Sequence, residues 1–555
     1  MPLIAEAVQQ DAQPSPPQGA DGLNQRTTLP TATAATLLRH IVTVEPREAL
    51  AVVSPLDERV LGYVPACTAD DVAEAVARGR RAQRAWAERS VDDRASLLQR
   101  VAHLVFARQD EVLDLIQLET GKVRSHAFEE VAVLSMTAAY YARMGASHLR
   151  PRRREGALPL LTSTLELRHP KGVVGFVCPW NYPLMLAVAD ILPAVMAGNA
   201  CVLKPAQQTP FTALWAVELL AAAGLPGDLV TVVTGRGSEL GDPLIDAVDA
   251  VTFTGSTATG RQVARRAAER LVSTSLELGG KNAMLVLDDA ALDAAVEGAV
   301  RGCFTSAGQM CVGIERLLVH TAIADDFLER FVERIGELRL STALGWGGDV
   351  GSLATREQFE TVARHVADAV AQGATVLAGG ASRPEVGPLV YAPTVLGDVT
   401  ESMAVATEET FGPVVSFGTF DDEDDAVARV NDTAYGLSAS IWTRHPQRGE
   451  RLARRLRTGS VNVNEAYSAA YASFDASMGG VGDSGLGRRH GREGIWRYTE
   501  LQTIATQRLL PFAGVVPGLS DERSAQVLTI GLQLLGRSPR MPSVLRRLPR
   551  LPSHH

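Results

Sequence analysis

The sequence of 555 residues has few cysteines and none of the spacings that would give them a structural role. The five cysteines, Cys67, Cys178, Cys201, Cys303 and Cys311, are odd in number and widely separated, and no Cys-x-x-Cys pair occurs. This pattern argues against a disulfide scaffold and against a zinc cage, and it favours a reducing compartment. We therefore expect a cytoplasmic protein and predict no metal site.

Other absences exclude further classes of protein. No run of 18 or more apolar residues occurs, so we expect no transmembrane helix. Residues 1–19 lack a basic stretch followed by an apolar core, so we expect no secretory signal. The net charge of -9 gives no overall basic character, so nucleic acid is not an expected partner. What remains is a globular composition, with 46% hydrophobic residues, in a chain long enough for two or three domains.

The order of apolar and polar segments predicts an α/β fold. Residues 1–40 are rich in Gln, Pro, Ala and Thr, which is typical of a disordered arm. Short apolar strands then alternate with helices, which indicates a parallel sheet covered on both faces. The predicted strands are 172–177, 200–203, 229–233 and 250–254, with helices at 184–197 and 210–223 between them; a second α/β region, 282–484, has strands at 283–287, 317–319 and 414–417. Ligands of such sheets bind beyond the carboxyl ends of the strands.

Two segments outside these sheets have their own character. Residues 151–170 contain an Arg run and alternating polar and apolar residues, which predict a projecting β-hairpin; its Arg run is either a solvated face or a subunit contact. The C-terminal segment 509–555 is basic and includes an apolar stretch at 527–535 that is too short to span a bilayer. We expect a helix packed on the body or on a neighbouring subunit, with attachment to an acidic membrane surface as the alternative.

Polar residues at two strand ends are candidates for binding a nucleotide. Gly255 and Ser256 follow the 250–254 strand and precede a helix, where backbone N–H groups and the helix end can approach a pyrophosphate. The alternative is an ordinary helix cap. Lys204 follows the 200–203 strand and suits an adenosine ribose or its phosphate, or else it is a surface lysine.

Four further residues are candidates for chemistry. Cys311 follows a Gly-Gln turn and is either a nucleophile or an inert buried thiol. Glu277, before a double glycine, is a general base if burial raises its pKa, and otherwise a turn residue. Asn181, between aromatics and prolines, can donate to an oxyanion or simply shape a turn. Glu409, with Phe411 nearby, can grip a ribose and pack a nicotinamide ring, or can lie in a solvated acidic loop.

Taken together, and in the order in which they occur along the chain, the motifs resemble the aldehyde dehydrogenase superfamily across residues 41–508. The matching segments are 179–181, 204–206, 253–260, 277–281, 308–311, 408–414 and 478–488. The resemblance implies a Rossmann-like cofactor domain, an α/β catalytic domain and a small β oligomerisation element. It divides the chain into a dinucleotide-binding domain (41–151 and 172–277), a catalytic domain (278–485), an oligomerisation element (152–171 and 490–508) and a basic extension (509–555). A homodimer or homotetramer is expected.

The resemblance also implies a role for each motif residue. Cys311 would attack the aldehyde carbon, Asn181 and the N–H of Cys311 would stabilise the oxyanion, and Glu277 would activate the water that hydrolyses the thioester. The cofactor is NADP or NAD, and its implied contacts are Trp180, Lys204, Ala206, Gln207, Gly255, Ser256, Leu278, Glu409 and Phe411. Many NAD-preferring relatives have Glu at the position of Gln207; the neutral Gln would not repel a 2′-phosphate, which favours NADP. Cys303 matches no motif and is expected to pack in the core.

Segments 170–175, 311–316 and 487–491 are most similar to the NADP-dependent succinate-semialdehyde dehydrogenases of actinobacteria. The resemblance therefore favours succinate semialdehyde as the substrate. Two positions depart from that pattern, because Thr305 and Ala189 stand where many such enzymes have the Arg that binds the substrate carboxylate. A broader aliphatic or aromatic aldehyde dehydrogenase is the alternative, and a non-catalytic relative is a remote one. Arg489 also replaces the usual Glu, which argues against a proton relay at that position.

Overall fold

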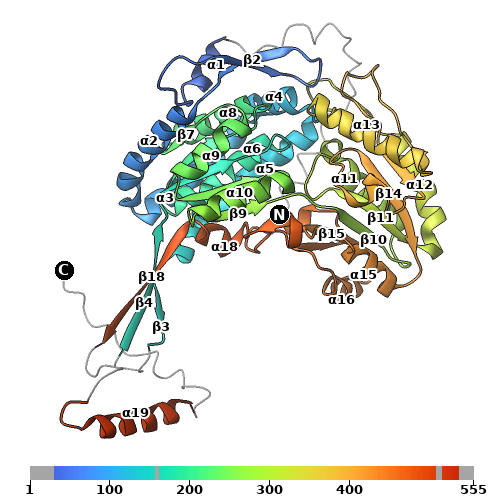
Figure 1. The fold of residues 1–555 in the computed structure, drawn as a ribbon. Helices are drawn as coiled ribbons and strands as arrows, with labels where there is room; N and C mark the ends of the chain where they lie inside the picture. Colours follow the sequence, from blue (N-terminus) through green and yellow to red (C-terminus); the bar gives the residue numbers. More distant parts are fainter. Residues whose placement is uncertain (1–30, 157–161, 508–515, 537–555) are drawn as a thin grey trace, which may run out of the picture. The chain divides into compact units, whose positions relative to one another are not determined.

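The structure is a computed structural model that describes residues 31–156, 162–507 and 516–536. The chain divides into two compact units (Figure 1). The first consists of Met1–Leu149 and His169–Glu500, and the second of Arg150–Arg168 and Leu501–His555. Residues 1–30 of the predicted arm lie outside the described residues, as does most of the basic extension. The predicted domain boundaries stay a prediction.

The first unit contains a six-stranded sheet in the order β17-β9-β8-β5-β6-β7. Its strands are β5 (Val173–Val177), β6 (Ala200–Lys204), β7 (Val230–Val232), β8 (Ala250–Thr254), β9 (Ser273–Glu277) and β17 (Gly485–Leu486). All neighbouring pairs are parallel except β17 with β9. Strands β6 and β8 are buried along their whole length, because helices cover both faces and the sequence supplies apolar side chains to each. The predicted parallel sheet is confirmed.

Eleven described helices pack around this sheet and its core (Figure 1). They are α1 (Thr31–Leu38), α2 (Ala69–Ala87), α3 (Val91–Ala107), α4 (Gln109–Thr120), α5 (Arg124–Leu149), α6 (Pro183–Val188), α7 (Ile191–Met196), α8 (Pro210–Ala222), α9 (Gly237–Ala247), α10 (Thr257–Glu269) and α18 (Gly491–Trp496). Helix α2 begins after Thr68, and Thr68 and Asp71 form a capping box in which the Thr68 N–H donates to Asp71 Oδ2 at 2.8 Å. A two-stranded antiparallel sheet, β1 (Ala49–Val53) with β2 (Val60–Pro65), lies in the same unit.

The second sheet of the first unit has seven strands in the order β12-β13-β14-β11-β10-β15-β16. They are β10 (Asn282–Val286), β11 (Ile314–His320), β12 (Thr375–Ala378), β13 (Thr394–Gly397), β14 (Val414–Phe420), β15 (Ser438–Trp442) and β16 (Ser460–Val463), all parallel to their neighbours except β12. The accompanying helices are α11 (Leu292–Phe304), η2 (Thr305–Gly308), η3 (Thr321–Ile323), α12 (Ala324–Gly336), α13 (Arg356–Ala371), α14 (Ala404–Thr407), α15 (Glu423–Asn431), α16 (Pro446–Ala453), α17 (Ser468–Tyr471) and η4 (Gly482–Ser484). Figure 1 shows α12 and α13 on one side of this sheet and α15 and α16 on the other.

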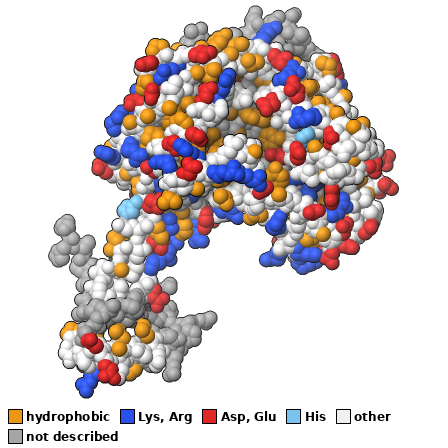
Figure 2. Space-filling model, in the orientation of Figure 1, with side chains coloured by type: hydrophobic (Ala, Val, Ile, Leu, Met, Phe, Trp, Pro, Cys, Tyr) orange, Lys and Arg blue, Asp and Glu red, His pale blue; other side chains and the backbone are white. Residues whose placement is uncertain are grey.

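The second unit contains a three-stranded sheet in the order β18-β4-β3 and helix α19 (Asp521–Gly536). Strands β3 (Arg152–Arg154) and β4 (Thr162–Pro170) pair antiparallel, which confirms the predicted hairpin. Strand β18 (Thr499–Gln507) is an end strand, and every residue of it after Thr499 is exposed. Hydrophobic side chains also lie at the surface of α19, among them Val527 and Ile530 (Figure 2).

Two sequence predictions differ from the structure. The predicted helix 184–197 is two short helices, α6 and α7, separated by Ala189 and Asp190. Pro193 lacks the N–H that would bond to the Ala189 carbonyl, and its ring crowds that carbonyl, so the helix breaks there. The predicted arm extended to residue 40, but residues 31–38 form α1, and Leu37 is buried in the core. No helix in the described part of the chain is long and apolar enough to cross a membrane.

Candidate active site

The three predicted catalytic residues line one cavity of about 410 Å³ in the first unit. Glu277 is the last residue of β9, Asn181 lies in the turn between β5 and α6, and Cys311 lies between η2 and β11. Leu278, a predicted cofactor contact, also lines the cavity. Cys311 is partly exposed, whereas Glu277 and Asn181 are buried, so Cys311 is the most accessible residue of the three. The two sheets thus contribute a thiol, a carboxylate and an amide to one space.

A left-handed turn places the sulfur of Cys311. Ser306, Ala307 and Gly308 have φ values of 55°, 54° and 72°, and the two non-glycine residues each cost roughly 1–2 kcal/mol in this conformation. The buried Gln309 side chain holds the turn, because its Nε2 donates to the Ser306 carbonyl at 3.0 Å and its Oε1 accepts from the Ala354 N–H at 2.9 Å. Cys311 is two residues after Gln309, so the turn fixes the position from which the Cys311 side chain extends.

Asn181 is held by its backbone and by its side chain. Its Nδ2 donates to the Gln309 carbonyl at 3.0 Å, and its own carbonyl accepts from Lys122 Nζ at 2.6 Å. Lys122 is in turn paired with Glu130 at 2.8 Å, and the Glu130 carboxylate accepts from the N–H groups that begin α6. The amide has a second hydrogen, which is available to an oxyanion formed at Cys311.

Glu277 has the electrostatic character of a general base. Its Oε1 is buried and makes no hydrogen bond to any described residue. Burial raises the pKa of the carboxyl to about 7, against a smaller lowering by the Arg489 guanidinium. A base that is half ionised near neutral pH can take a proton from water, which an ordinary surface carboxylate does poorly.

A buried arginine lies at the same end of the cavity. Arg489 donates from Nε to Asp190 at 3.1 Å and from Nη2 to Thr254 at 2.6 Å, and Arg497 also pairs with Asp190. Burial raises the pKa of the Cys311 thiol to about 12, and the positive charge of Arg489 opposes that rise. The charge of Arg489 therefore favours the thiolate form of Cys311. Its hydrogen bonds go to Asp190 and Thr254, so they do not involve the Asn181 amide.

The other predicted cofactor residues lie outside the lining of this cavity. Lys204 is the last residue of β6, and the other residues come after the carboxyl ends of β5, β6 and β8, which share one edge of the first sheet: Trp180, Ala206 with Gln207, and Gly255 with Ser256. Ser256 caps α10 by accepting from the Thr259 N–H at 3.4 Å, so the positive end of this helix lies directly after β8, where a helix end favours an anion. Lys204 is buried, and burial lowers its pKa to about 8.

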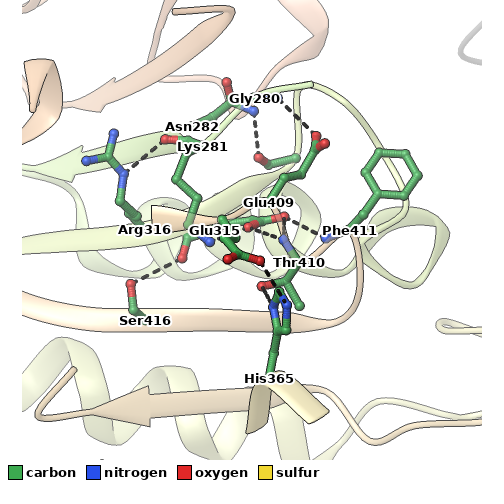
Figure 3. A network of polar contacts seen from close by, with 12 residues as sticks. Gly280, Lys281, Asn282, Glu315, Arg316, His365, Glu409, Thr410, Phe411 and Ser416 are labelled. Atoms are coloured by element: carbon green, nitrogen blue, oxygen red, sulfur yellow. Dashed lines mark hydrogen bonds and ion pairs between the residues drawn. The ribbon is translucent and has the colours of Figure 1, made fainter. Parts of the chain in front are cut away.

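The loop 408–413 brings Glu409 and Phe411 to the glycines after Glu277. Glu409 Oε1 accepts from the Gly280 N–H at 3.0 Å, and a Cβ on Gly279 would lie only 2.2 Å from Glu409 Oε2 (Figure 3). Phe411 packs edge-on against Trp180 at a centroid distance of 5.6 Å. Two aromatic rings thus lie beside the Glu409 carboxylate and the glycine backbone. This set of groups fits a nicotinamide nucleoside whose ribose would bond to Glu409.

The rest of the cavity carries charge of both signs. The Tyr467 hydroxyl lies 3.0 Å from Glu129 Oε1 and 3.4 Å from Thr305 Oγ1. Arg301 also lines the cavity, and its guanidinium lies 3.7 Å from Glu465, a longer contact than a hydrogen bond. The Arg301 side chain makes no hydrogen bond to a described residue, so its guanidinium has donors available at the cavity wall.

Sequence reasoning missed the residues that hold these groups, namely Lys122, Glu130 and the Arg489–Asp190 pair. The groups that Lys122 and Glu130 hold, at Asn181 and at the start of α6, lie more than 50 residues away in sequence, and Asp190 is 299 residues from Arg489, so no local spacing reveals these contacts. Lysine usage does offer a signal, since the chain has only four lysines among 54 basic residues. Three of them, Lys122, Lys204 and Lys281, are buried at or beside motif residues. Buried lysine is rare in proteins. In a chain whose basic residues are nearly all arginine, each lysine is therefore a candidate for a specific buried contact.

Comparison with known proteins agrees with this geometry. The model of the aldehyde dehydrogenase family matches residues 41–504. A Mycolicibacterium smegmatis protein, provisionally named a succinate-semialdehyde dehydrogenase of the NADP(+) type, is 47% identical over 87% of this chain and 94% of its own. The crystal structure of a succinate-semialdehyde dehydrogenase from Burkholderia pseudomallei superposes with a TM-score of 0.81 at 32% identity, over 85% of this chain and 98% of the other. A Staphylococcus aureus betaine aldehyde dehydrogenase in complex with NAD+ gives a TM-score of 0.81 at 29% identity, over 87% and 99%.

Proposed function

Because this chain belongs to the aldehyde dehydrogenase family, we propose that it oxidises succinate semialdehyde to succinate with NADP+ through a thioester on Cys311. The observation that carries the proposal is the shared cavity of Cys311, Glu277 and Asn181. The name of the Mycolicibacterium smegmatis relative supports both the substrate and NADP. Gln207 supports NADP as well, since it is neutral and makes no hydrogen bond to a described residue.

The proposed chemistry uses each of the three residues once. The Cys311 sulfur attacks the aldehyde carbon, and Asn181 Nδ2 with the Cys311 N–H stabilises the oxyanion. NADP+, when bound, supplies the oxidation by accepting a hydride from that carbon. Glu277 then takes a proton from water, the water oxygen attacks the thioester carbon, and the C–S bond breaks to release the acid and the thiol. Glu409 and Phe411 would orient the cofactor, and Lys204, Gly255 and Ser256 would bind its adenosine and pyrophosphate.

We propose that Arg301 supplies the carboxylate contact that Thr305 and Ala189 cannot. Arg301→Gln should lower kcat/KM for succinate semialdehyde by about 10- to 100-fold, because it removes a charge-assisted hydrogen bond. The same variant should change kcat/KM for butanal less than about twofold. Arg330→Gln is a matched control, since Arg330 lies on α12, pairs with Asp293 and does not line the cavity.

The decisive comparison of substrates is kcat/KM for succinate semialdehyde and for butanal, each with NAD and NADP. A preference for the anionic aldehyde supports the proposal. The second candidate is a broader aldehyde dehydrogenase, and Glu129 and Glu465 favour it, because two carboxylates in the cavity wall oppose an anionic substrate. An equal or better rate with butanal, unaffected by Arg301→Gln, would establish that alternative.

We propose that the second unit mediates a homodimer or homotetramer. Support comes from β18, an end strand whose side chains are exposed on both faces, including Leu501 and Ile504. Leu501→Arg with Ile504→Arg should reduce the particle mass measured by analytical ultracentrifugation, because charges enter the proposed contact. Val370→Arg on α13 is the control, being another exposed apolar position. An unchanged oligomer in the double variant would contradict this location of the interface.

We also propose a reducing, cytoplasmic location, which the five free cysteines support.

A further inference from the structure

Glu315 has a set of contacts that the proposed reaction does not use. It is the second residue of β11, four residues after Cys311, and it is 6% exposed. Its Oε1 accepts from the Phe411 N–H at 2.8 Å, and its Oε2 accepts from the Thr410 N–H at 2.9 Å (Figure 3). Lys281 also donates to Oε2 as a buried ion pair. A buried carboxylate needs such donors to remain ionised, and here two of the three belong to one loop.

That loop carries the proposed nicotinamide contacts. Phe411 has a φ of 52°, a conformation that non-glycine residues rarely adopt, so the loop needs support from outside. Gln358 Nε2 donates to the carbonyls of Thr410 and Phe411 at 2.8 and 2.9 Å. Glu315 therefore fixes the N–H groups of the same two residues whose carbonyls Gln358 fixes. Both sets of bonds hold the backbone that carries the Phe411 ring, which packs against Trp180.

The second connection runs through Lys281. Lys281 follows Gly280, whose N–H donates to Glu409 Oε1 at 3.0 Å, and the Lys281 carbonyl accepts from Arg316 Nε at 3.0 Å (Figure 3). The ion pair of Lys281 with Glu315 thus ties the glycine turn to β11. Glu409 is held by this turn at one side and by its own loop at the other, and Glu315 bonds to both. Glu315 does not line the aldehyde cavity.

We propose that Glu315 is a positioning residue for the nicotinamide half of the cofactor, acting through the Thr410–Phe411 backbone and through Lys281 on Glu409. The inference rests on the proposed function, in which Glu409 and Phe411 contact the nicotinamide nucleoside. It separates two halves of the cofactor site, because Lys204, Gly255 and Ser256 lie at the ends of β6 and β8, whereas Glu315 bonds to Lys281 and to the loop of Thr410 and Phe411. Changing Glu315 should weaken the grip on the nicotinamide half alone.

The test is the dissociation constant of two ligands for Glu315→Gln, measured by isothermal titration calorimetry. Gln keeps the size of the side chain, but it turns one acceptor into a donor that faces the loop N–H groups or Lys281. The Kd for NADP+ should rise at least tenfold. The Kd for adenosine 2′,5′-bisphosphate, which lacks the nicotinamide nucleoside, should stay within twofold of the wild-type value. In steady state, KM for NADP+ should rise while KM for the aldehyde at saturating NADP+ stays unchanged.

Asp71→Asn is the matched control. Asp71 is a fully buried carboxylate that also accepts two backbone N–H groups, those of Val44 and Thr68, and pairs with Arg47. It should lower thermal stability without changing either Kd. If Glu315→Gln does not fold, Glu315→Asp serves instead, because it keeps the charge on a side chain too short to reach both N–H groups. It should weaken NADP+ binding selectively as well.

An unchanged Kd for NADP+ in a folded Glu315 variant would overturn the inference, and so would an equal loss for both ligands. Failure of the wild type to bind NADP+ or to oxidise an aldehyde would instead contradict the proposed function. The two failures are therefore distinguishable in one set of titrations.

Discussion

Replacing Cys311 with alanine should abolish aldehyde-dependent formation of NADPH, with a fall in kcat of more than about 10⁴-fold. The pre-steady-state burst should vanish too, because the burst reports the first hydride transfer after covalent attack. Cys311 is the one cysteine that lines the cavity among the residues the structure describes, so no other thiol can take its place. The measurement is stopped-flow absorbance of the reduced cofactor.

Cys303→Ala is the control for this variant. Cys303 lies on α11, eight residues before Cys311, and is fully buried in the core of the second sheet. Its loss should lower the free energy of unfolding by about 1 kcal/mol, because a small cavity forms, and should leave the burst intact. A burst that survives in Cys311→Ala would rule out the covalent route.

Glu277→Gln should uncouple the two halves of the reaction. The burst of NADPH should remain at about one equivalent per active site, whereas steady-state turnover should fall by about 10²- to 10⁴-fold, since thioester hydrolysis loses its base. In the wild type, burial raises the pKa of Glu277 to about 7, so kcat should increase with pH through that value as the carboxylate forms. In the variant this dependence should be absent. Full steady-state activity of Glu277→Gln would refute the role of base.

The same variant should not weaken the fold. Because the folded-state pKa of Glu277 is raised from 4.5 to about 7, folding favours the protonated carboxyl. Its contribution to stability is complete below about pH 4.5 and is lost as pH rises through 7. As pH rises from about 4.5 to 7, the free energy of unfolding of Glu277→Gln should therefore increase relative to that of the wild type. Urea unfolding at several pH values measures the difference.

The sequence predicted elements whose signals are local. The apolar runs after Gly172 and before Gly255 are predicted as strands, and they are strands of one parallel sheet. The break at Ala189–Asp190 was not predicted, although Pro193 gives its physical cause. An internal proline tolerated in the first turn of a second helix looks, from periodicity alone, like part of a single helix.

The candidate site shows the same division. Motif order predicted that Cys311, Glu277 and Asn181 would meet, and the structure brings them to one cavity. The sequence did not predict the left-handed conformation of Ser306 and Ala307, because neither residue type favours positive φ. The supporting pairs, Lys122 with Glu130 and Lys281 with Glu315, join residues from different elements. Such contacts depend on tertiary structure, and a single sequence carries little sign of them.

The most direct test of the account is peptide mapping of Glu277→Gln after it is mixed with succinate semialdehyde and NADP+. Acid quenching should preserve the thioester, and mass spectrometry should locate a succinyl group on the peptide that contains Cys311. One adduct per subunit, formed together with one NADPH, is the predicted result. NADPH formation with no adduct, or an adduct on another residue, would contradict covalent catalysis by Cys311.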